Sequence, residues 1–119
     1  GTLSSSYPHA EITLCEQVLN GIPINAKRTI SLQREGNQIY IYLKNDSPFN
    51  TEKISVRLFR KSKYALDYDE VVSSKIFQIS RDWADAYFKY KFNSPGEYRI
   101  NVYDENELLI KTAYISVVN

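Results

Sequence analysis

The sequence predicts an all-β domain, an antiparallel β-sandwich or barrel of seven to eight strands. Several stretches alternate apolar and polar residues with a period of two, which is typical of strands with one buried face. Turn-forming residues recur about every ten positions, a spacing found in sandwiches. No segment has the period of a long amphipathic helix, and the only helical candidate is a single turn at 80–86 that begins with Ser80.

The clearest strand begins at Gln38, where Ile39, Ile41 and Leu43 alternate with polar or amphipathic residues. Segment 71–79 is rich in β-branched residues but irregular in phase, so we expect an edge strand there. The expected strands, in chain order, are 11–18, 28–33, 37–44, 53–61, 71–79, 86–92, 97–103 and 108–117.

Two connections are expected to be tight turns. Ser94-Pro95-Gly96 joins strands 86–92 and 97–103, because proline presets φ and glycine tolerates a positive one. The polar link 104–107 has the length that hairpins use, and we expect its acidic residues to be solvated.

The composition bounds the class of protein. With 119 residues, 43% hydrophobic and 24% charged, the chain is long enough for one globular domain, which we expect to span 11–119. The net charge of +1 argues against a nucleic-acid partner, and no stretch is apolar enough to span a membrane. Residues 1–10 resemble a cleavage scar joined to a flexible leader. We therefore expect that a signal segment was removed and that the protein is extracytoplasmic: periplasmic, secreted or lipid-anchored.

The segment Pro95-Gly96-Glu97-Tyr98 and the alternation after it resemble the corner and sixth strand of immunoglobulin-like and fibronectin type III sandwiches. In those families a tyrosine follows this turn and its hydroxyl bonds back to upstream backbone. The resemblance implies that strands 37–44 and 86–92 are neighbours in one sheet and 53–61 and 97–103 in the other. The arrangement is also similar to small bacterial extracytoplasmic domains, although the cysteine pair and central tryptophan of antibody domains are absent.

Templates for catalysis, cofactors and metals are not matched. Cys15 is the only cysteine, and the only histidine, His9, lies in the expected leader. The Asp67–Glu70 segment lacks the spacing of a calcium loop. Asp82 and Asp85 could act as an acid pair on a glycoside only in a cleft. A cleft lined by Asp69, Asp82 and Asp85 would favour an enzymatic function. We therefore expect no catalytic, cofactor or metal site, and a protein that is not an enzyme.

Two outward strand faces are candidate surfaces. The first combines cations with aromatic rings from strands 53–61 and 97–103, extended by Tyr114 or Ala113 according to register. Its residues are Arg57, Phe59, Lys61, Arg99 and Tyr103. The second lies on strands 37–44 and 86–92. Its residues are Tyr40, Tyr42, Tyr87 and Lys89.

These patterns support more than one interpretation. Aromatic pairs across strands stabilise sheets, so both faces have a purely structural explanation. The leading functional expectation is a non-enzymatic immunoglobulin-like module that contacts a protein partner, or a neighbouring domain of a larger envelope protein, through the first face. The alternative is a carbohydrate-binding module with the second face as its stacking platform. The tyrosines divide accordingly: Tyr90 and Tyr98 are expected in the core, and the tyrosines of the two faces on the surface.

Overall fold

The computed structural model describes residues 7–33, 37–61, 67 and 70–119. The first six residues of the expected leader, and residues 68–69 of the acidic segment, lie outside this part.

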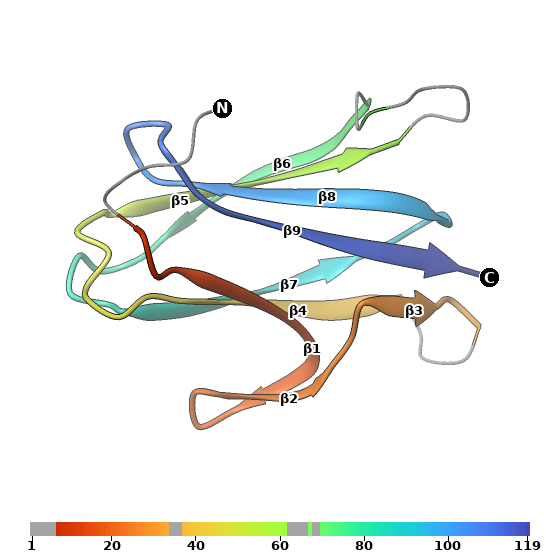
Figure 1. Ribbon diagram of the computed structural model, residues 1–119, viewed down its shortest axis with the longest axis horizontal. Coiled ribbons are helices and arrows are strands. Elements are labelled where there is room, and N and C mark those ends of the chain that lie inside the picture. Colours follow the sequence, from red (N-terminus) through yellow and green to blue (C-terminus); the bar gives the residue numbers. More distant parts are fainter. Residues whose placement is uncertain (1–6, 34–36, 62–66, 68–69) are drawn as a thin grey trace.

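The described residues form nine strands and no helix (Figure 1). The strands pack as two layers, a four-stranded sheet in the order β2-β1-β4-β7 and a five-stranded sheet in the order β3-β9-β8-β5-β6. The all-β sandwich is thus confirmed. The bounds are β1 (Glu11–Leu19), β2 (Ile22–Ala26), β3 (Thr29–Ser31), β4 (Gln38–Lys44), β5 (Lys53–Arg60), β6 (Glu70–Gln78), β7 (Asp85–Lys91), β8 (Gly96–Tyr103) and β9 (Leu109–Val118).

Strand pairing follows the expected neighbours. β4 pairs with β7 and β5 pairs with β8, all antiparallel. β6 is an edge strand, as its irregular pattern predicted. One pair is parallel, that of β3 with β9, so the five-stranded sheet is mixed.

The ninth strand, β2, lies between the expected strands 11–18 and 28–33, in a segment where none was expected. Asn20 and Gly21 instead form a two-residue hairpin turn with φ values of 52° and 74°. Positive φ at both positions is what a type I′ turn requires, and Asn-Gly is its preferred sequence. β1 therefore pairs with β4 only as far as Cys15 and then continues into the β1–β2 hairpin.

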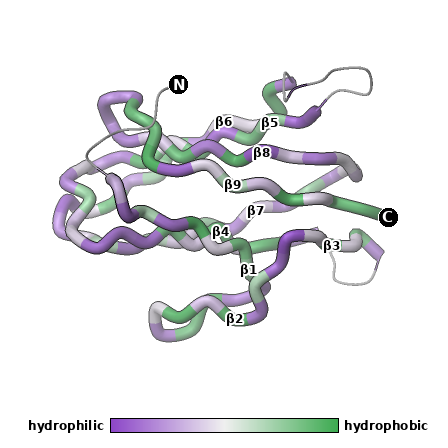
Figure 2. The backbone as a smooth tube through the Cα atoms, in the orientation of Figure 1, coloured by the Kyte–Doolittle hydropathy of each residue, from purple (hydrophilic) through white to green (hydrophobic). Residues whose placement is uncertain are grey.

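The core lies between the two sheets. Figure 2 shows hydrophobic and hydrophilic residues alternating along the strands. The inward aliphatic residues, such as Leu43, Ile54 and Ile100, are fully buried. Burial of each such side chain contributes roughly 1.5–3 kcal/mol, so this layer is the main source of stability.

Tyr98 anchors the turn between β7 and β8. Its side chain is 2% exposed, and its hydroxyl donates to the backbone carbonyl of Ser94 over 2.7 Å. This is the upstream hydrogen bond that the resemblance to immunoglobulin-like sandwiches implied. Gly96 leaves room for the neighbouring Arg60, whose Cδ would lie 3.0 Å from any added Cβ.

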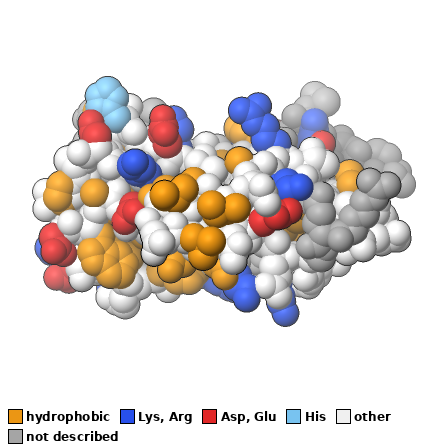
Figure 3. Space-filling view, turned by 90° about the horizontal axis from the view of Figure 1, so that it is seen from below, with side chains coloured by type: hydrophobic (Ala, Val, Ile, Leu, Met, Phe, Trp, Pro, Cys, Tyr) orange, Lys and Arg blue, Asp and Glu red, His pale blue; other side chains and the backbone are white. Residues whose placement is uncertain are grey.

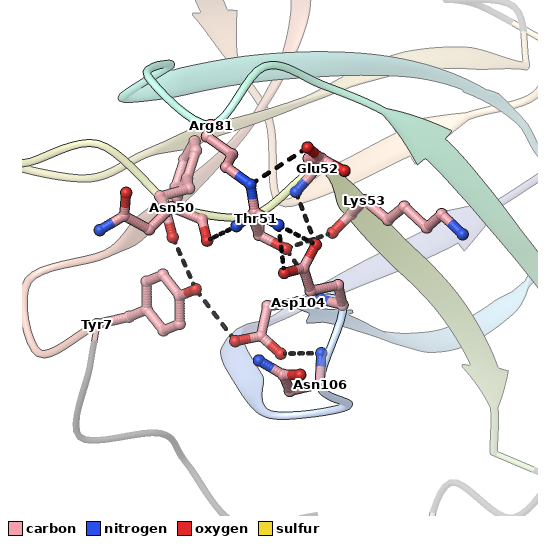
Figure 4. Close-up of polar contacts among 10 residues, drawn as sticks. Tyr7, Asn50, Thr51, Glu52, Lys53, Arg81, Asp104 and Asn106 are labelled. Carbon is pink, nitrogen blue, oxygen red and sulfur yellow. Dashed lines mark hydrogen bonds and ion pairs between the residues drawn. The ribbon is translucent and has the colours of Figure 1, made fainter.

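At one end of the sandwich, Arg81 ties three connections together (Figure 4). Its guanidinium lies 3.2 Å from Glu52 and 3.0 Å from Glu105, and donates to the carbonyl of Asn50 over 2.9 Å. The backbone N–H of Glu52 also donates to Glu105 over 3.0 Å. The hydrogen bond from this N–H and, to a smaller extent, the Arg81 guanidinium hold the pKa of the Glu105 carboxyl below its ordinary value.

Two expectations are wrong, one about Asp104 and one about Tyr7. Asp104 was expected in a solvated turn but is buried, with Oδ1 accepting the N–H groups of Asn106 and Leu108. An aspartate that accepts backbone donors in this way closes its own turn. Its other oxygen accepts the hydroxyl of Tyr7 over 3.1 Å (Figure 4). Tyr7 and Ala10 are buried, so this part of the expected leader packs onto the sandwich.

Each of the four outermost strands, two in each sheet, carries a feature that discourages pairing with another chain. β2 contains Pro23, β3 has only three residues, and β7 bears exposed Lys89 and Lys91. On β6 the protecting residue is Lys75, which points between the sheets with its Nζ 5.4 Å from the ring centroid of Tyr90. The four outermost edges are therefore protected against the addition of a strand from another chain.

Candidate functional site

The strongest candidate surface is the outer side of the five-stranded sheet. We call it the arginine–aromatic face, and it comprises Arg57, Phe59, Lys61, Arg99 and Tyr103. Its strands β5 and β8 are direct neighbours, and Phe59 is opposite Arg99 in the register. Their intervening residues, such as Leu58 and Ile100, are buried, so the alternation of the strands turns the face outward.

The face is organised by two stacked pairs of a cation and a ring. The guanidinium carbon of Arg57 lies 4.4 Å from the ring centroid of Tyr103, and that of Arg99 lies 4.7 Å from the ring of Phe59. Each strand supplies one arginine and one ring, so the pairs run in opposite directions across the same strand boundary. Such contacts contribute about 0.5–1 kcal/mol each at exposed sites.

Carboxylates also contact the same guanidinium groups. Arg57 forms an ion pair with Glu107, and Arg99 lies 3.9 Å from Asp67. The ring contacts, together with these ion pairs, restrict the two long side chains before any partner binds. This lowers the entropy that is lost when they are immobilised at an interface.

Tyr103 was expected on the surface, but it is buried. Arg57 covers its ring and leaves the side chain only 5% exposed. Its hydroxyl accepts the Nδ2 of Asn101 over 2.9 Å, and Asn101 in turn accepts the hydroxyl of Thr112 over 2.9 Å. This polar chain crosses β8 and β9 and was missed, since its parts are polar residues at ordinary outward positions. Tyr103 therefore supports the face from below.

The margins of the face are apolar or cationic. The register places Tyr114, rather than Ala113, opposite Arg99. On the far side, Val71 and Ile76 of β6 are 62% and 66% exposed, and Lys61 is exposed where β5 ends. Ordered arginines and rings with exposed apolar neighbours have the composition of a protein interface centre.

The second candidate surface does not form the expected platform. Tyr42 is 4% exposed, because its hydroxyl lies 2.8 Å from both the carbonyl of Gly21 and the carboxylate of Asp85. Burial of the hydroxyl and, after it, the neighbouring Asp85 carboxylate raise the pKa of Tyr42 to about 12. The unexpected β1–β2 hairpin is the reason, since its turn lies against this tyrosine.

The other two rings of this surface are not coplanar. Tyr40 and Tyr87 meet edge to face, with centroids 6.0 Å apart and planes at 71°. Lys89 is opposite Tyr40 and exposed. Figure 3 looks at the molecule from this side and shows hydrophobic side chains gathered over its middle. A flat stack for a sugar ring is therefore not present among these residues.

Groups with reactive chemistry have structural partners. Cys15 is buried, its thiol donates to the carbonyl of Tyr40 over 3.8 Å, and burial raises its pKa. Asp85 holds the Tyr42 hydroxyl rather than pairing with Asp82. Among the described residues, no three His, Cys, Asp or Glu side chains are grouped so as to hold a metal ion. The same part of the chain contains no helix long and apolar enough to cross a membrane.

Comparison with known proteins bears on the fold alone. No family model matches the chain, and no curated protein matches it. Among solved structures it is similar to the soluble domain of PmoD from Methylocystis sp., with a TM-score of 0.53 and 12% identity over 91% of this chain and 90% of that one. It is also similar to a superoxide reductase (neelaredoxin) from Ignicoccus hospitalis, with a TM-score of 0.50 and 10% identity over 91% and 79% of the two chains. The chain thus has the fold of small all-β domains.

Proposed function

We propose that this protein is a non-enzymatic, extracytoplasmic module of the immunoglobulin-like type, and that its arginine–aromatic face contacts a protein partner or a neighbouring domain of an envelope protein. The observation that carries the proposal is the pair of reciprocal stacks, Arg57 on Tyr103 and Arg99 on Phe59.

Strand neighbours support the immunoglobulin-like type. Sandwiches of this class place the second and fifth strands in one sheet and the third and sixth in the other. Here β4 pairs with β7 and β5 pairs with β8. The hydroxyl of Tyr98, which donates to the upstream backbone carbonyl of Ser94, is similar to the tyrosine corner of this class and supports the proposal.

The chemistry of the face supports a protein as the partner. Arginine and aromatic residues are the types most enriched where binding energy concentrates in protein interfaces. The stacks and ion pairs order these side chains in advance, which suits a fixed and specific contact. A folded partner can cover the apolar margin at Val71 and Ile76, whereas a sugar would leave it exposed.

The location outside the cytoplasm is the part of the proposal that rests on the sequence alone. Fractionation of the native cells, with antibodies against this protein, tests it directly. Recovery in the envelope or medium fits the proposal, and recovery with cytosolic markers contradicts it.

The contact surface is tested with two matched triple variants. The face variant combines Arg57→Gln, Phe59→Leu and Arg99→Gln, and the control variant combines Tyr87→Leu, Lys89→Gln and Lys91→Gln on the other sheet. Each is used to capture partners from the native envelope, with quantitative mass spectrometry of the bound proteins. Loss of two or more interface anchors costs about 2 kcal/mol or more, or roughly a 30-fold loss of affinity.

We expect a protein that is captured by the wild type and by the control variant but lost with the face variant. Circular dichroism and thermal melting verify that both variants are folded. Equal capture of every partner by both variants would remove this face from consideration.

A further inference from the structure

A second groove of the molecule lies between the two sheets, where β6 ends and β7 begins. These are outermost strands of different sheets, and the groove between them has a volume of about 480 Å³. The connection from β6 to β7 turns at the end of the sandwich away from the C-terminus (Figure 1) and lines the groove together with both strands. Its volume is within the range of about 300–1,000 Å³ that is usual for small-ligand sites.

The most buried lining residues of this groove are apolar and closely packed. They include Ile79, Ala86 and Phe88. The ring of Phe77 on β6 contacts that of Phe88 on β7, with centroids 4.4 Å apart. The N–H of Ile79 donates to the carbonyl of Glu52 over 3.0 Å and fixes the backbone after β6. The groove therefore has a firm apolar base.

Trp83, on the connection, lines the groove and is exposed although its ring is large. It is 46% exposed, and among the described residues its ring contacts no other aromatic ring and its indole N–H has no hydrogen-bond partner. Its backbone is held on both sides. The N–H of Trp83 donates to the carbonyl of Ser80 over 3.1 Å, and its carbonyl accepts the N–H of the buried Phe49 over 2.8 Å. The ring is therefore presented from a fixed position, with its donor open to a ligand.

A second exposed ring and two polar side chains line the same groove. Tyr87 is 54% exposed and is held by an edge-to-face contact with Tyr40. Gln78 and Asp85 are also exposed. Asp85 Oδ2 accepts the hydroxyl of Tyr42 over 2.8 Å, which orients the carboxylate, and within the described residues no donor reaches Oδ1. Apolar walls with a few oriented polar groups are typical of a ligand site.

This combination of groups favours a carbohydrate. A pyranose ring carries axial C–H groups, which pack on the negative face of an aromatic ring. Its hydroxyls donate to a carboxylate such as Asp85 and accept from an indole N–H such as that of Trp83. A proline-rich segment also packs on aromatic rings, but its prolines bring no N–H for the carboxylate. Asp85 is the one charged side chain among the described residues of the groove, which disfavours an anionic sugar.

We propose that this groove binds an uncharged oligosaccharide, with one sugar ring stacked on Trp83 and the next unit against Tyr87. Gln78 and Asp85 form hydrogen bonds with its hydroxyls. The site is distinct from the tyrosine platform that the sequence suggested, because its main ring is a tryptophan on the connection between β6 and β7. It is also separate from the arginine–aromatic face and does not depend on the function of that face.

The first test uses Trp83 as its own reporter, because it is the only tryptophan in the chain. The protein is screened on an array of structurally diverse glycans, and each bound oligosaccharide is then titrated while the tryptophan emission is recorded. We expect at least one uncharged oligosaccharide that binds on the array and changes the emission in a saturable way. An array with no bound uncharged glycan, or bound glycans that leave the emission unchanged, would overturn the proposal.

Substitutions of Trp83 test the stacking, with affinities measured by isothermal titration calorimetry and folding verified by circular dichroism. Trp83→Ala is expected to lose about tenfold or more in affinity for the selected oligosaccharide, and Trp83→Phe, which keeps a ring, about threefold. Tyr114→Leu is the control, because it removes a ring of similar exposure, 56%, from the other sheet. We expect this control to bind within about twofold of wild type. Equal affinities of wild type and Trp83→Ala would contradict the proposal.

The role of the carboxylate is tested through selectivity. Asp85→Asn keeps the size of the side chain and an oxygen for the Tyr42 hydroxyl, but it removes the charge. We expect the wild type to bind the selected oligosaccharide about tenfold tighter than a counterpart with a carboxylate in place of one primary hydroxyl, and the variant to bind both within about threefold. The same selectivity in both proteins would contradict the contact between Asp85 and the sugar.

A polyproline peptide tests the other class of occupant. Decaproline is titrated into the wild type and into Trp83→Ala by calorimetry, and we expect no saturable binding to either protein. Binding to the wild type that is lost in the variant would assign the groove to a proline-rich segment and would overturn the carbohydrate proposal.

Discussion

The stack of Arg99 on Phe59 is open to a direct energetic measurement. The guanidinium carbon lies 4.7 Å from the ring centroid, within the range of a cation–π contact. The Arg99 side chain is only 24% exposed, which places the expected coupling at about 1 kcal/mol, the upper end for exposed sites. For a domain of this size, that coupling corresponds to roughly 4 °C in melting temperature.

A double-mutant cycle isolates this contact from the others made by each residue. Phe59→Leu removes the ring but keeps an apolar side chain, and Arg99→Met removes the charge but keeps an unbranched chain. Urea denaturation of the wild type, the two single variants and the double variant gives four free energies of unfolding. The part of their effects that is not additive is the coupling.

The ion pair of Arg99 with Asp67 provides the control. It spans 3.9 Å, and the Asp67 side chain is 82% exposed, so Asp67→Asn is expected to change stability by less than about 0.5 kcal/mol. A coupling near zero, or an Asp67→Asn effect as large as the coupling, would refute the ordering of this face by its rings.

Three further predictions follow from other parts of the fold. Tyr98→Phe removes the buried hydroxyl that donates to Ser94, and we expect a loss of about 1–1.5 kcal/mol in urea denaturation; a loss below about 0.3 kcal/mol would mean that the corner is not structural. Lys75→Val removes the inward charge of the β6 edge, and light scattering is expected to show concentration-dependent self-association, with Lys44→Val of the interior strand β4 as a control that stays monomeric. The lowered pKa of Glu105 stabilises the folded state at pH values above the ordinary pKa of 4.5, and this stabilisation is lost as the pH falls through the lowered pKa. The melting temperatures of the wild type and of Glu105→Gln are therefore expected to differ at pH 7 and to converge below pH 4.5. A constant difference across this range would contradict the linkage.

Strands were the most predictable part of the molecule, because a period of two depends only on which face is buried. The segment with Ile39, Ile41 and Leu43 is an example, and its strand lies where the alternation placed it. The hairpin turn at Asn20–Gly21 was also readable, since Asn-Gly between strands is a strong local signal. It was overlooked because Pro23 suggested the end of a strand rather than an edge strand.

Burial of polar and amphipathic side chains was harder to predict, because it depends on residues far away in the chain. Tyr42 is covered by a turn that lies 21 positions earlier in the sequence, and Tyr103 by Arg57 of another strand. Asp104 was a partial exception, since an aspartate in a turn commonly accepts the backbone N–H of the residue two positions on. Alternation assigns a face to each side chain, but it carries no information about what covers that face.

The central claim is that a partner contacts the outer side of the five-stranded sheet. The most direct measurement places the photo-crosslinking amino acid p-benzoylphenylalanine at Lys61 and at Tyr114, both exposed on this side, and at Tyr87 on the other sheet as a control. The account predicts, after irradiation of native cells, a discrete crosslinked product from the first two positions and none from the third. A product from Tyr87 alone would contradict it.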